Sequence, residues 1–328
     1  MTRLIVVCGP TGTGKSKLAV RLAGQFGGEV VSADSMQVYR GLVVGTAAPT
    51  AQEQQGVAHH LIGCCPPQQP YSVADWMQDA HRVIQDVENR GRLPILCGGT
   101  GLYIQSLISG VDYTHTPADP ALRGRLYEEW EKLGGEAMLL RLRQRDMEHA
   151  EKLHVNDKKR ILRSLEQNMV TGYTARQRAE RSRDEKSRYA ALCLGLDYSE
   201  RSQLYEATDA RVDGMLRQGL LKEARQVWEH RDSYKTAAQA IGYKEFFPFF
   251  EGDEMELEAC ALRLKQATRN YAKRQLTWFR RMPDIHWLQA DAPALWQEAW
   301  ALVQNWLAQN IAEAGREVQQ GVQEEPAK

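Results

Sequence analysis

The chain has 328 residues, and its 42 lysines and arginines balance 42 aspartates and glutamates, so that the formal net charge is zero. A chain of this length can hold one sizeable core and a second unit, because domains cluster near about 100–200 residues. Zero net charge excludes binding of a polyanion through overall charge, so such a partner would need local clusters of basic residues.

The cysteine pattern and the apolar runs indicate a reducing environment away from membranes. No pair of cysteines has C-x-x-C spacing, no secretory signal is recognisable after Met1, and nowhere do about 18 apolar residues run together. We therefore expect a cytoplasmic protein with buried thiols, no structural zinc and no membrane span. The cysteines are Cys8, Cys64, Cys65, Cys97, Cys193 and Cys260.

A glycine-rich loop, GPTGTGKS, follows an apolar run at residues 4–7 and precedes apolar residues at helical spacing. Strand, glycine loop and helix follow in the order of a phosphate-binding loop. Its backbone N–H groups and the helix N-terminus can hold a di- or triphosphate, with Lys15 on the outer phosphate and the Ser16 hydroxyl on Mg²⁺. The alternative is a glycine turn that only connects two elements. The predicted phosphate-binding residues are Gly9, Pro10, Thr11, Gly12, Thr13, Gly14, Lys15 and Ser16.

Asp34 directly follows the second predicted strand, residues 29–33. Ligands of open parallel sheets bind at the carboxyl ends of the strands, so we expect Asp34 near the phosphate loop. It could be a Mg²⁺ ligand or a general base, and the structural alternative is an N-cap for the residues that follow.

The stretch 45–70 is rich in Gly, Pro, Gln and Thr and is predicted to be a loop. It carries His59 and His60, but no third ligand stands at metal spacing, which favours ordinary loop or core histidines over a zinc site. A helix capped by Ser72, with Asp75 three residues later, is expected to run to about residue 89.

A third apolar strand, residues 93–97, ends in a second glycine turn with the sequence Gly-Gly-Thr-Gly. Glycines at a strand's carboxyl end allow the backbone to approach a ligand, and Thr100 offers a hydroxyl there. We expect this turn to share a sheet edge with the phosphate loop.

From about residue 115 to 188 the sequence becomes helical, charged and poor in strands, with 14 basic and eight acidic residues between Arg141 and Arg188. Lys159, Arg160 and Arg163 fall on adjoining faces of one helix turn, a pattern suited to a phosphate backbone and equally compatible with a solvated face. The segment 174–188 lacks apolar periodicity and is predicted to be a mobile basic loop.

Strand character returns at residues 189–196, so the basic lobe is an insertion in the sheet-bearing core. Residues 263–281 then form a predicted helix with seven basic residues, no acidic residue, and three interleaved aromatic residues. Basic and aromatic side chains on one helix suit RNA, whereas packing against the sheet explains the aromatics only.

These elements predict an α/β fold: a P-loop NTPase-like parallel sheet flanked by helices, with an inserted, mainly helical lobe. A last strand at 285–288 and a tryptophan-rich amphipathic helix at 296–307 close the core. We expect a core of residues 1–114 and 189–308, an inserted, basic helical lobe at 115–188 and a disordered tail at 309–328.

The motifs together resemble the tRNA dimethylallyltransferases, also called tRNA isopentenyltransferases, over residues 9–288. Besides the phosphate loop, the resemblance rests on DSMQVYRG from Asp34, HHLI from His59, YSVADW from Tyr71, GGTGLYI from Gly98, NDKKRILRSLE from Asn156, GLD from Gly195, RV and ML from Arg211, AIGYKE from Ala240 and TRNYAKRQLTWFR from Thr268. The chain departs from the family pattern at Ala58, Gly63, Ala207 and Thr208.

The resemblance implies that the phosphate loop binds the diphosphate of dimethylallyl diphosphate, with Mg²⁺ as cofactor. The family's reaction moves the dimethylallyl group to the N6 amine of the adenosine next to the anticodon on its 3′ side, and diphosphate leaves. By the same resemblance Asp34, Thr100 and Arg211 are catalytic, with Asp34 as the base for the amine and Arg211 neutralising diphosphate. In agreement, no apolar strand ends in the acidic pair that an ATPase uses to place Mg²⁺ and water.

The implied partner is the anticodon arm of tRNA, bound to a monomer with the target base out of its stack. Arg123 and Thr100 are expected to lie against the RNA near the reacting centre. The residues predicted to contact tRNA are Asp34, Ser35, Met36, Gln37, Thr100, Arg123, Lys159, Arg160, Ile161, Leu162, Arg163, Gly242, Tyr243, Lys244, Arg269, Lys273 and Arg274.

Three other functions fit parts of the pattern. A phosphate-loop kinase for a nucleotide or other small metabolite would need ATP, and a non-catalytic RNA-binding or NTP-switch protein would not need Asp34. An enzyme that prenylates free adenine nucleotides could use the same loop. The basic lobe and the acid-free helix argue against a small acceptor, which does not need them.

Overall fold

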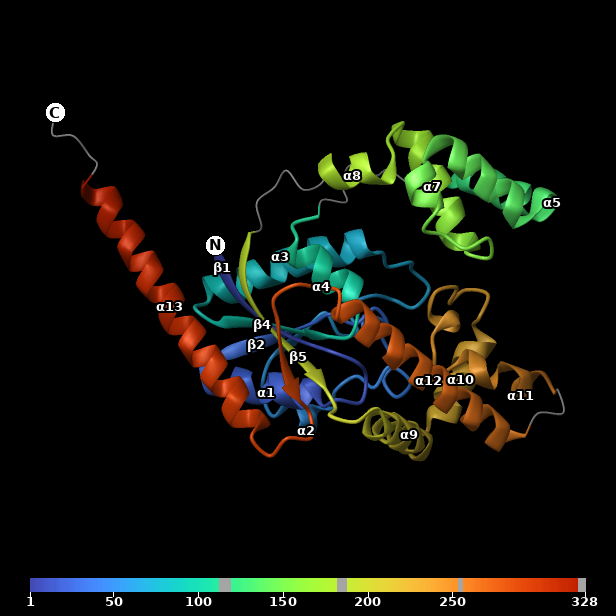
Figure 1. Ribbon diagram of the computed structural model, residues 1–328. Helices are drawn as coiled ribbons and strands as arrows, with labels where there is room; N and C mark the ends of the chain where they lie inside the picture. The colour runs from blue at the N-terminus through green and yellow to red at the C-terminus, as the bar shows by residue number, and fades with distance from the viewer. Residues whose placement is uncertain (112–118, 182–187, 253–255, 324–328) are drawn as a thin grey trace. The chain divides into compact units, whose positions relative to one another are not determined.

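Among the described residues, six strands form one parallel sheet in the order β3-β2-β4-β1-β5-β6 (Figure 1). The computed structural model describes residues 1–111, 119–181, 188–252 and 256–323, and residues 311–323 as backbone only. The strands are β1 (Thr2–Cys8), β2 (Gly28–Ser32), β3 (His59–His60), β4 (Leu93–Gly98), β5 (Tyr189–Asp197) and β6 (Ile285–Gln289). The predicted α/β fold with a parallel sheet and flanking helices is confirmed.

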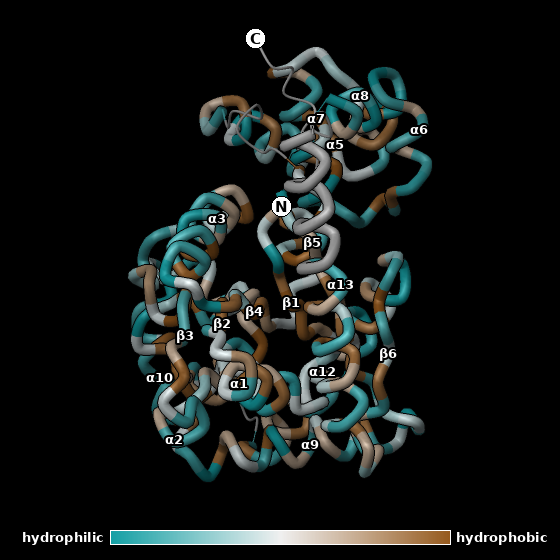
Figure 2. The backbone as a smooth tube through the Cα atoms, turned by 90° about the vertical axis from the view of Figure 1, so that its left-hand side faces the viewer, coloured by the Kyte–Doolittle hydropathy of each residue, from teal (hydrophilic) through white to brown (hydrophobic). Residues whose placement is uncertain are grey.

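The central strands are apolar along their length because helices cover both faces of the sheet. In β1, residues 4–8 are all buried, and Figure 2 shows hydrophobic residues concentrated in β1 and β4. On one face, alternate strand residues pack with α1 (Lys15–Phe26) and α13 (Leu295–Gln323). On the other side of the sheet lies α3 (Val73–Asn89), whose Trp76 ring stacks on Tyr103 of α4 (Gly101–Ile108) at a centroid distance of 4.5 Å.

The remaining elements of the sheet-bearing unit are short helices and the long helices that follow β5. They are α2 (Ala51–Gln54), α9 (Arg201–Arg217), α10 (Leu220–Glu229), η1 (Ala237–Gln239), η2 (Lys244–Phe246), α11 (Phe247–Glu251) and α12 (Leu257–Phe279). Helices α9 and α12 pack against each other.

The chain divides into two compact units, residues 1–105 with 189–328, and residues 106–188. The second unit therefore begins inside α4, before the expected boundary at residue 115. Its described helices are α5 (Pro120–Arg145), α6 (Met147–Ala150), α7 (Lys158–Thr171) and α8 (Ala175–Arg181), and it has an apolar core of its own.

Four local expectations differ from the structure. His59 and His60 form β3, because their backbone extends the sheet beside β2, so the stretch 45–70 is not all loop. Helix α8 occupies part of the predicted mobile segment 174–188, of which residues 182–187 lie outside the described residues. Helix α13 continues to Gln323, which corrects the expected disorder from residue 309 up to that point.

The fourth difference concerns the thiols. Cys64 is exposed, whereas the other cysteines are buried as expected, and all are free. No helix of the described chain contains a segment long and apolar enough to cross a bilayer.

Candidate active site

The sheet register brings three polar turns to one edge. Cys8 of β1 lies opposite Gly98 of β4, and Cys97 lies opposite Ser32 of β2. The phosphate loop, Asp34 and the Gly-Gly-Thr-Gly turn all follow directly after these residues. The expected juxtaposition at the carboxyl edge is therefore present, because β4 lies between β1 and β2.

The phosphate loop is built as a cradle at the N-terminus of α1. Gly9 has φ 136°, and a Cβ there would lie 2.4 Å from the carbonyl oxygen of Leu196, so only glycine fits. The Thr13 hydroxyl donates to the Pro10 carbonyl oxygen at 2.9 Å and closes the loop. No described hydrogen bond uses the backbone N–H groups of residues 12–14, which leaves consecutive donors for an anion.

Lys15 projects back over this loop. Its Nζ donates to the Pro10 carbonyl oxygen at 2.6 Å. Burial lowers the pKa of Lys15 to about 8, with nearby Arg211 lowering and Asp34 raising it. An anion that binds here would favour the charged form of this amine, because a nearby opposite charge raises the pKa of an amine.

The two carboxylate oxygens of Asp34 differ in their hydrogen bonds. Its Oδ1 accepts hydrogen bonds from the backbone N–H groups of Met36 at 2.8 Å and Gln37 at 3.2 Å. The alternative of a helix N-cap is wrong, because residues 35–38 form a turn and not a helix, and Oδ1 caps this turn instead. No described hydrogen bond uses Oδ2, which leaves that oxygen for a ligand or proton.

Thr100 connects the turns after β4 and β2. Its hydroxyl oxygen accepts from the backbone N–H of Ser35 at 3.1 Å, and its own N–H donates to the Ala33 carbonyl oxygen at 3.1 Å. These two bonds hold the backbone on both sides of Asp34.

Arg211 of α9 completes a charged cluster around Asp34. Burial lowers the pKa of Arg211, and the Asp34 carboxylate raises it in part. Arg211 in turn lowers the pKa of Lys15. Two cations and one carboxylate therefore interact at this edge, and the predicted catalytic residues Asp34, Thr100 and Arg211 lie in one site.

Two residues of α12 belong to the same site and were missed as site residues. Burial and the Asp34 carboxylate raise the pKa of the Tyr271 phenol, which also hydrogen-bonds with Thr100. Gln275 contacts both glycine turns. The sequence offered only their position in an aromatic, basic helix, which gives no sign of which face meets the sheet.

The oxygen atoms present fit a hard cation that keeps most of its own water. Ser16 is exposed at the first turn of α1, where its hydroxyl oxygen can reach a hydrated cation. The described residues contain no cluster of three or more His, Cys, Asp or Glu side chains able to hold a metal by themselves. Such a site suits Mg²⁺ bound chiefly through a diphosphate.

Several predicted tRNA contacts have structural partners instead. Tyr243 is fully buried, and its hydroxyl donates to Glu223 at 2.8 Å. The same Glu223 carboxylate accepts three backbone N–H groups from residues 43–45. The Gln37 side chain accepts a hydrogen bond from the Ser32 hydroxyl. The side chains of Tyr243 and Gln37 therefore hold the loop after Asp34 in place through hydrogen bonds within the protein. Gly242 is also buried, whereas Lys244 is exposed.

The basic residues on α12 and directly after it divide into those with an acidic partner and those without. Arg269 pairs with Asp209 at 2.6 Å and Lys265 with Asp213 at 2.7 Å, both on α9. Arg280 pairs with Asp197 at the end of β5. Acidic residues on neighbouring elements therefore pair with three of these basic residues, although the helix itself carries no acid between residues 263 and 281. The expectation that packing explains only the aromatic residues is wrong to this extent, because packing also supplies these acidic partners. Among the described residues, no ion pair involves Arg263, Lys273, Arg274 or Arg281, and all four are exposed.

The second unit holds its own arginine pair. The Glu166 side chain is 1% exposed and accepts from Arg123 at 2.9 Å and from Arg163 at 3.0 Å. Burial would raise the pKa of Glu166, but the hydrogen bonds from both arginines outweigh it and lower the pKa. Lys159 and Arg160 are exposed on α7.

Two further residues predicted to contact tRNA lie inside this unit. Ile161 is 0% and Leu162 2% exposed, within the apolar core. Their side chains cannot reach RNA, because they pack the helix that carries Lys159 and Arg160.

The departures from the family pattern are accommodated locally. The Ala58 carbonyl oxygen accepts from the N–H of Val30 at 2.9 Å, and Gly63 donates to Gln37 at 2.8 Å with φ 60°. Thr208 is buried beside Gly12, where an added Cβ would lie 3.2 Å from its methyl group. Ala207 precedes it on α9 and borders the same glycine.

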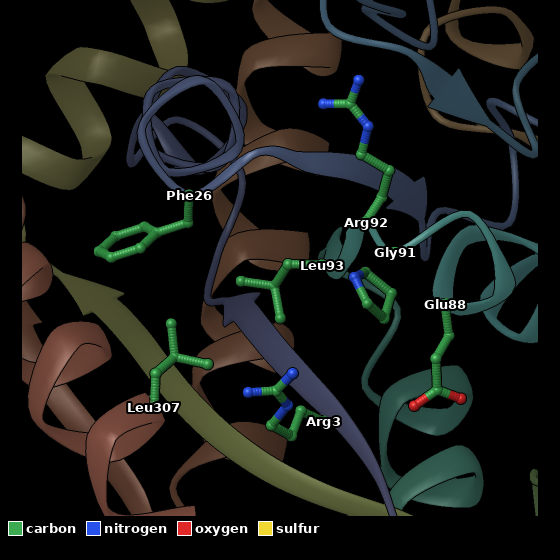
Figure 3. A pocket seen from close by; sticks show the side chains of 8 residues that line it. Arg3, Phe26, Glu88, Gly91, Arg92, Leu93 and Leu307 are labelled. Atoms are coloured by element: carbon green, nitrogen blue, oxygen red, sulfur yellow. The ribbon is translucent and has the colours of Figure 1, made fainter. Parts of the chain in front are cut away.

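A pocket lies at the opposite edge of the sheet, where β1 and β4 begin (Figure 3). Because the phosphate loop lies at the carboxyl ends of these strands, this pocket is separate from the candidate active site. Its lining residues are Arg3, Phe26, Glu88, Gly91, Arg92, Leu93, Pro94 and Leu307.

The chain matches known proteins along most of its length. The IPP transferase family profile matches residues 37–282, and the isopentenyl transferase profile matches residues 2–64. A tRNA dimethylallyltransferase from Enterococcus faecalis is 41% identical over 320 residues, covering 95% of this chain and 100% of the relative. One from Carboxydothermus hydrogenoformans is 40% identical, covering 89% of this chain and 94% of the relative.

Solved structures agree in fold. The crystal structure of a full-length tRNA isopentenylpyrophosphate transferase from Bacillus halodurans is similar with a TM-score of 0.70 and 36% identity, covering 97% of this chain and 100% of that chain. A eukaryotic dimethylallyltransferase acting on tRNA gives a TM-score of 0.79 and 31% identity, covering 94% of this chain and 80% of that chain. The chain belongs to the tRNA dimethylallyltransferase family.

Proposed function

We propose that the chain transfers a dimethylallyl group from dimethylallyl diphosphate to the N6 amine of the adenosine 3′-adjacent to the anticodon in tRNA. As a member of its family it is a prenyltransferase acting on tRNA. The observation that supports the proposed site most is the mutual interaction of Lys15, Asp34 and Arg211 beside the phosphate loop. The two cations can neutralise the departing diphosphate, and the carboxylate can accept a proton from the amine.

The leaving group determines what the phosphate loop must do. The bond between C1 of the dimethylallyl group and the diphosphate oxygen breaks, and its electron pair stays on the diphosphate. Charge therefore develops on that oxygen in the transition state, where fixed donors are most effective. The free N–H groups of residues 12–14, Lys15 and Arg211 can supply this stabilisation.

Asp34 has the role of base. The adenine N6 lone pair is delocalised into the ring, so the amine needs orientation and removal of a proton as the new C–N bond forms. Asp34 Oδ1 is fixed by Met36 and Gln37, while Oδ2 is available for the N6 proton. Thr100 holds the turn that carries this carboxylate through its bond with Ser35.

Ser16 would hold Mg²⁺ together with the diphosphate oxygens. When bound, Mg²⁺ would supply positive charge at the diphosphate, and the protein would hold it through the hydroxyl oxygen at the first turn of α1.

Two basic surfaces are proposed to bind the anticodon arm. One consists of the exposed cations Lys273 and Arg274 on α12. The other, in the second unit, consists of Lys159 and Arg160 with the arginines held by Glu166. Cations neutralise the RNA backbone, and unstacking of the target base exposes its N6 amine.

Mass spectrometry of nucleosides tests the function. The protein is incubated with tRNA, Mg²⁺ and dimethylallyl diphosphate, and a matched tRNA carries guanosine in place of the target adenosine. We expect dimethylallyl-adenosine from the first tRNA only. Transfer of phosphate from ATP to an acceptor, or prenylation of free adenine nucleotides in place of tRNA, would contradict the proposal.

A further inference from the structure

One buried amide joins the two glycine turns at the active edge of the sheet. Gln275 of α12 is 6% exposed. Its Oε1 accepts from the backbone N–H of Thr11 at 2.9 Å, and its Nε2 donates to the Gly99 carbonyl oxygen at 2.9 Å. Thr11 belongs to the phosphate loop, and Gly99 directly precedes Thr100.

The geometry admits few side chains other than glutamine. A Cβ added at Gly99 would lie 2.2 Å from Gln275 Nε2, so the amide packs directly on the turn. The backbone N–H of Thr11 can only donate and the Gly99 carbonyl can only accept, which fixes the orientation of the amide. A carboxylate would lose the donor, and an aliphatic side chain would leave two buried polar groups without a partner.

The same helix carries exposed cations close in sequence to Gln275. Lys273 and Arg274 are exposed, whereas Gln275 and Leu276 face the interior. A single rigid element therefore presents charge outward and holds the phosphate loop inward.

We propose that Gln275 is a positioning residue that fixes the diphosphate loop relative to the turn carrying Thr100. This inference rests on the proposed function. The loop holds the leaving group and the Thr100 turn holds the base for the nucleophile, so Gln275 sets the separation between the reacting groups. Transfer is sensitive to this separation, because displacement by about 1 Å can cost roughly 10²-fold in rate.

Replacing the amide by an apolar chain of similar length gives the first test. For Gln275→Met we expect kcat to fall about 10- to 100-fold, while the Kd for tRNA stays within about twofold, because the exposed cations of α12 are retained. We also expect inorganic pyrophosphate to bind roughly tenfold more weakly by calorimetry, since the loop loses its support. The control is Gln304→Met, at an exposed position on α13, for which all three quantities should match the unsubstituted protein.

A second variant separates hydrogen bonding from packing. In Gln275→Glu, the protonated carboxyl can both accept from Thr11 and donate to Gly99, whereas the carboxylate cannot donate. Activity relative to the unsubstituted protein should therefore rise several-fold as the pH falls from about 8 to about 5.5, because burial raises the pKa of carboxyl groups. Taking the ratio at each pH compares two proteins that share the same charged and titratable neighbours of this site, namely Lys15, Asp34, Arg211 and Tyr271.

The outcomes distinguish this inference from the proposed function. Equal pyrophosphate affinity in Gln275→Met and the unsubstituted protein would overturn the role of Gln275, whether or not tRNA is prenylated. So would a pH-independent activity ratio for Gln275→Glu, or a loss of tRNA affinity that parallels the loss of turnover. Absence of prenylated tRNA with the unsubstituted protein would overturn the proposed function, and pyrophosphate affinity would still decide the role of Gln275.

Discussion

The hydroxyl oxygen of Thr100 accepts a hydrogen bond from the backbone N–H of Ser35 at 3.1 Å, which connects two turns 65 positions apart in the chain. Asp34 lies between this bond and the end of β2, so its carboxylate is oriented from a second element. The position of the proposed base thus depends on a contact between the turn that follows β2 and the turn that follows β4.

Removing this acceptor should misplace Asp34. In Thr100→Val the Ser35 N–H loses its partner, and we expect kcat to fall roughly tenfold, the equivalent of one hydrogen bond. Thr100→Ser keeps the hydroxyl and is the matched control, with kcat within about threefold. Steady-state kinetics decides, and equal kcat for the valine and serine variants would contradict this role.

Asp34→Asn tests the base without disturbing the turn. The amide oxygen can still accept from Met36 and Gln37, but it cannot take the N6 proton. We expect turnover to fall about 10²-fold or more, with a small change in tRNA affinity. Asp86→Asn, exposed on α3, serves as the control in single-turnover assays. Unchanged turnover in Asp34→Asn would remove Asp34 from the role of base.

The charged, buried amine of Lys15 should lower the free energy of unfolding, although diphosphate binding requires this charge. Burial lowers the pKa of Lys15 to about 8, so the folded protein binds this proton less tightly than the unfolded chain does. The penalty is complete below about pH 8 and is relieved as the pH rises toward the lysine value of about 10.4 in unfolded chains. Lys15→Met should therefore raise the free energy of unfolding at pH 7 by about 1–2 kcal/mol while abolishing pyrophosphate binding.

Denaturant unfolding at pH 7 and pH 10 measures this effect. The difference between Lys15→Met and the unsubstituted protein should shrink at the higher pH. Lys17→Met, at an exposed position on the same helix, should give no such pH dependence. A destabilised Lys15→Met at pH 7 would show that the amine is not a cost to folding.

The exposed cations of α12 should govern the salt dependence of RNA binding. Replacing Lys273 and Arg274 by alanine should weaken tRNA binding and lower the slope of log K against log salt by about 1.5, at about 0.7–0.9 for each phosphate contact. The matched double variant replaces Arg3 and Arg92, which lie at the opposite edge of the sheet. An unchanged slope for the α12 variant would rule out phosphate contact there.

Glu166 should stabilise the second unit above acidic pH. Hydrogen bonds from Arg123 and Arg163 lower the pKa of Glu166 against the effect of burial. Its stabilising contribution is therefore complete above about pH 4.3, the value in unfolded chains, and is lost as the pH falls through the lower folded pKa. Glu166→Gln should cost about 2 kcal/mol at pH 7, discounted because both arginines are half-exposed.

Hydrogen exchange of the α7 amides reports this loss locally. Protection should drop in Glu166→Gln at pH 7 and should not drop in Glu151→Gln, an exposed control in the same unit. Equal protection in the two variants would show that the arginines do not need the buried carboxylate.

Local patterns in the sequence were sufficient for the parallel sheet, apart from the short strand β3, and for the main polar turns. Apolar runs predicted β1, β4 and β5, because strands covered on both faces must be apolar throughout. The glycine spacing predicted the loop before α1, since its backbone conformation admits few other residues. Asp34 and Thr100 followed from the rule that polar residues after parallel strands meet at one edge.

Contacts between distant elements could be known only from the tertiary structure. The hydrogen bonds of Gln275 and the pairing of α12 cations with α9 acids depend on which helix faces meet, and sequence periodicity does not specify that. The burial of Ile161, Leu162 and Tyr243 has the same origin. The sequence by itself determined which groups the chain carries and at which turns, because backbone geometry is local. Only packing decided which of those groups remain free for a ligand, because hydrogen bonds and ion pairs form between residues brought together by the fold.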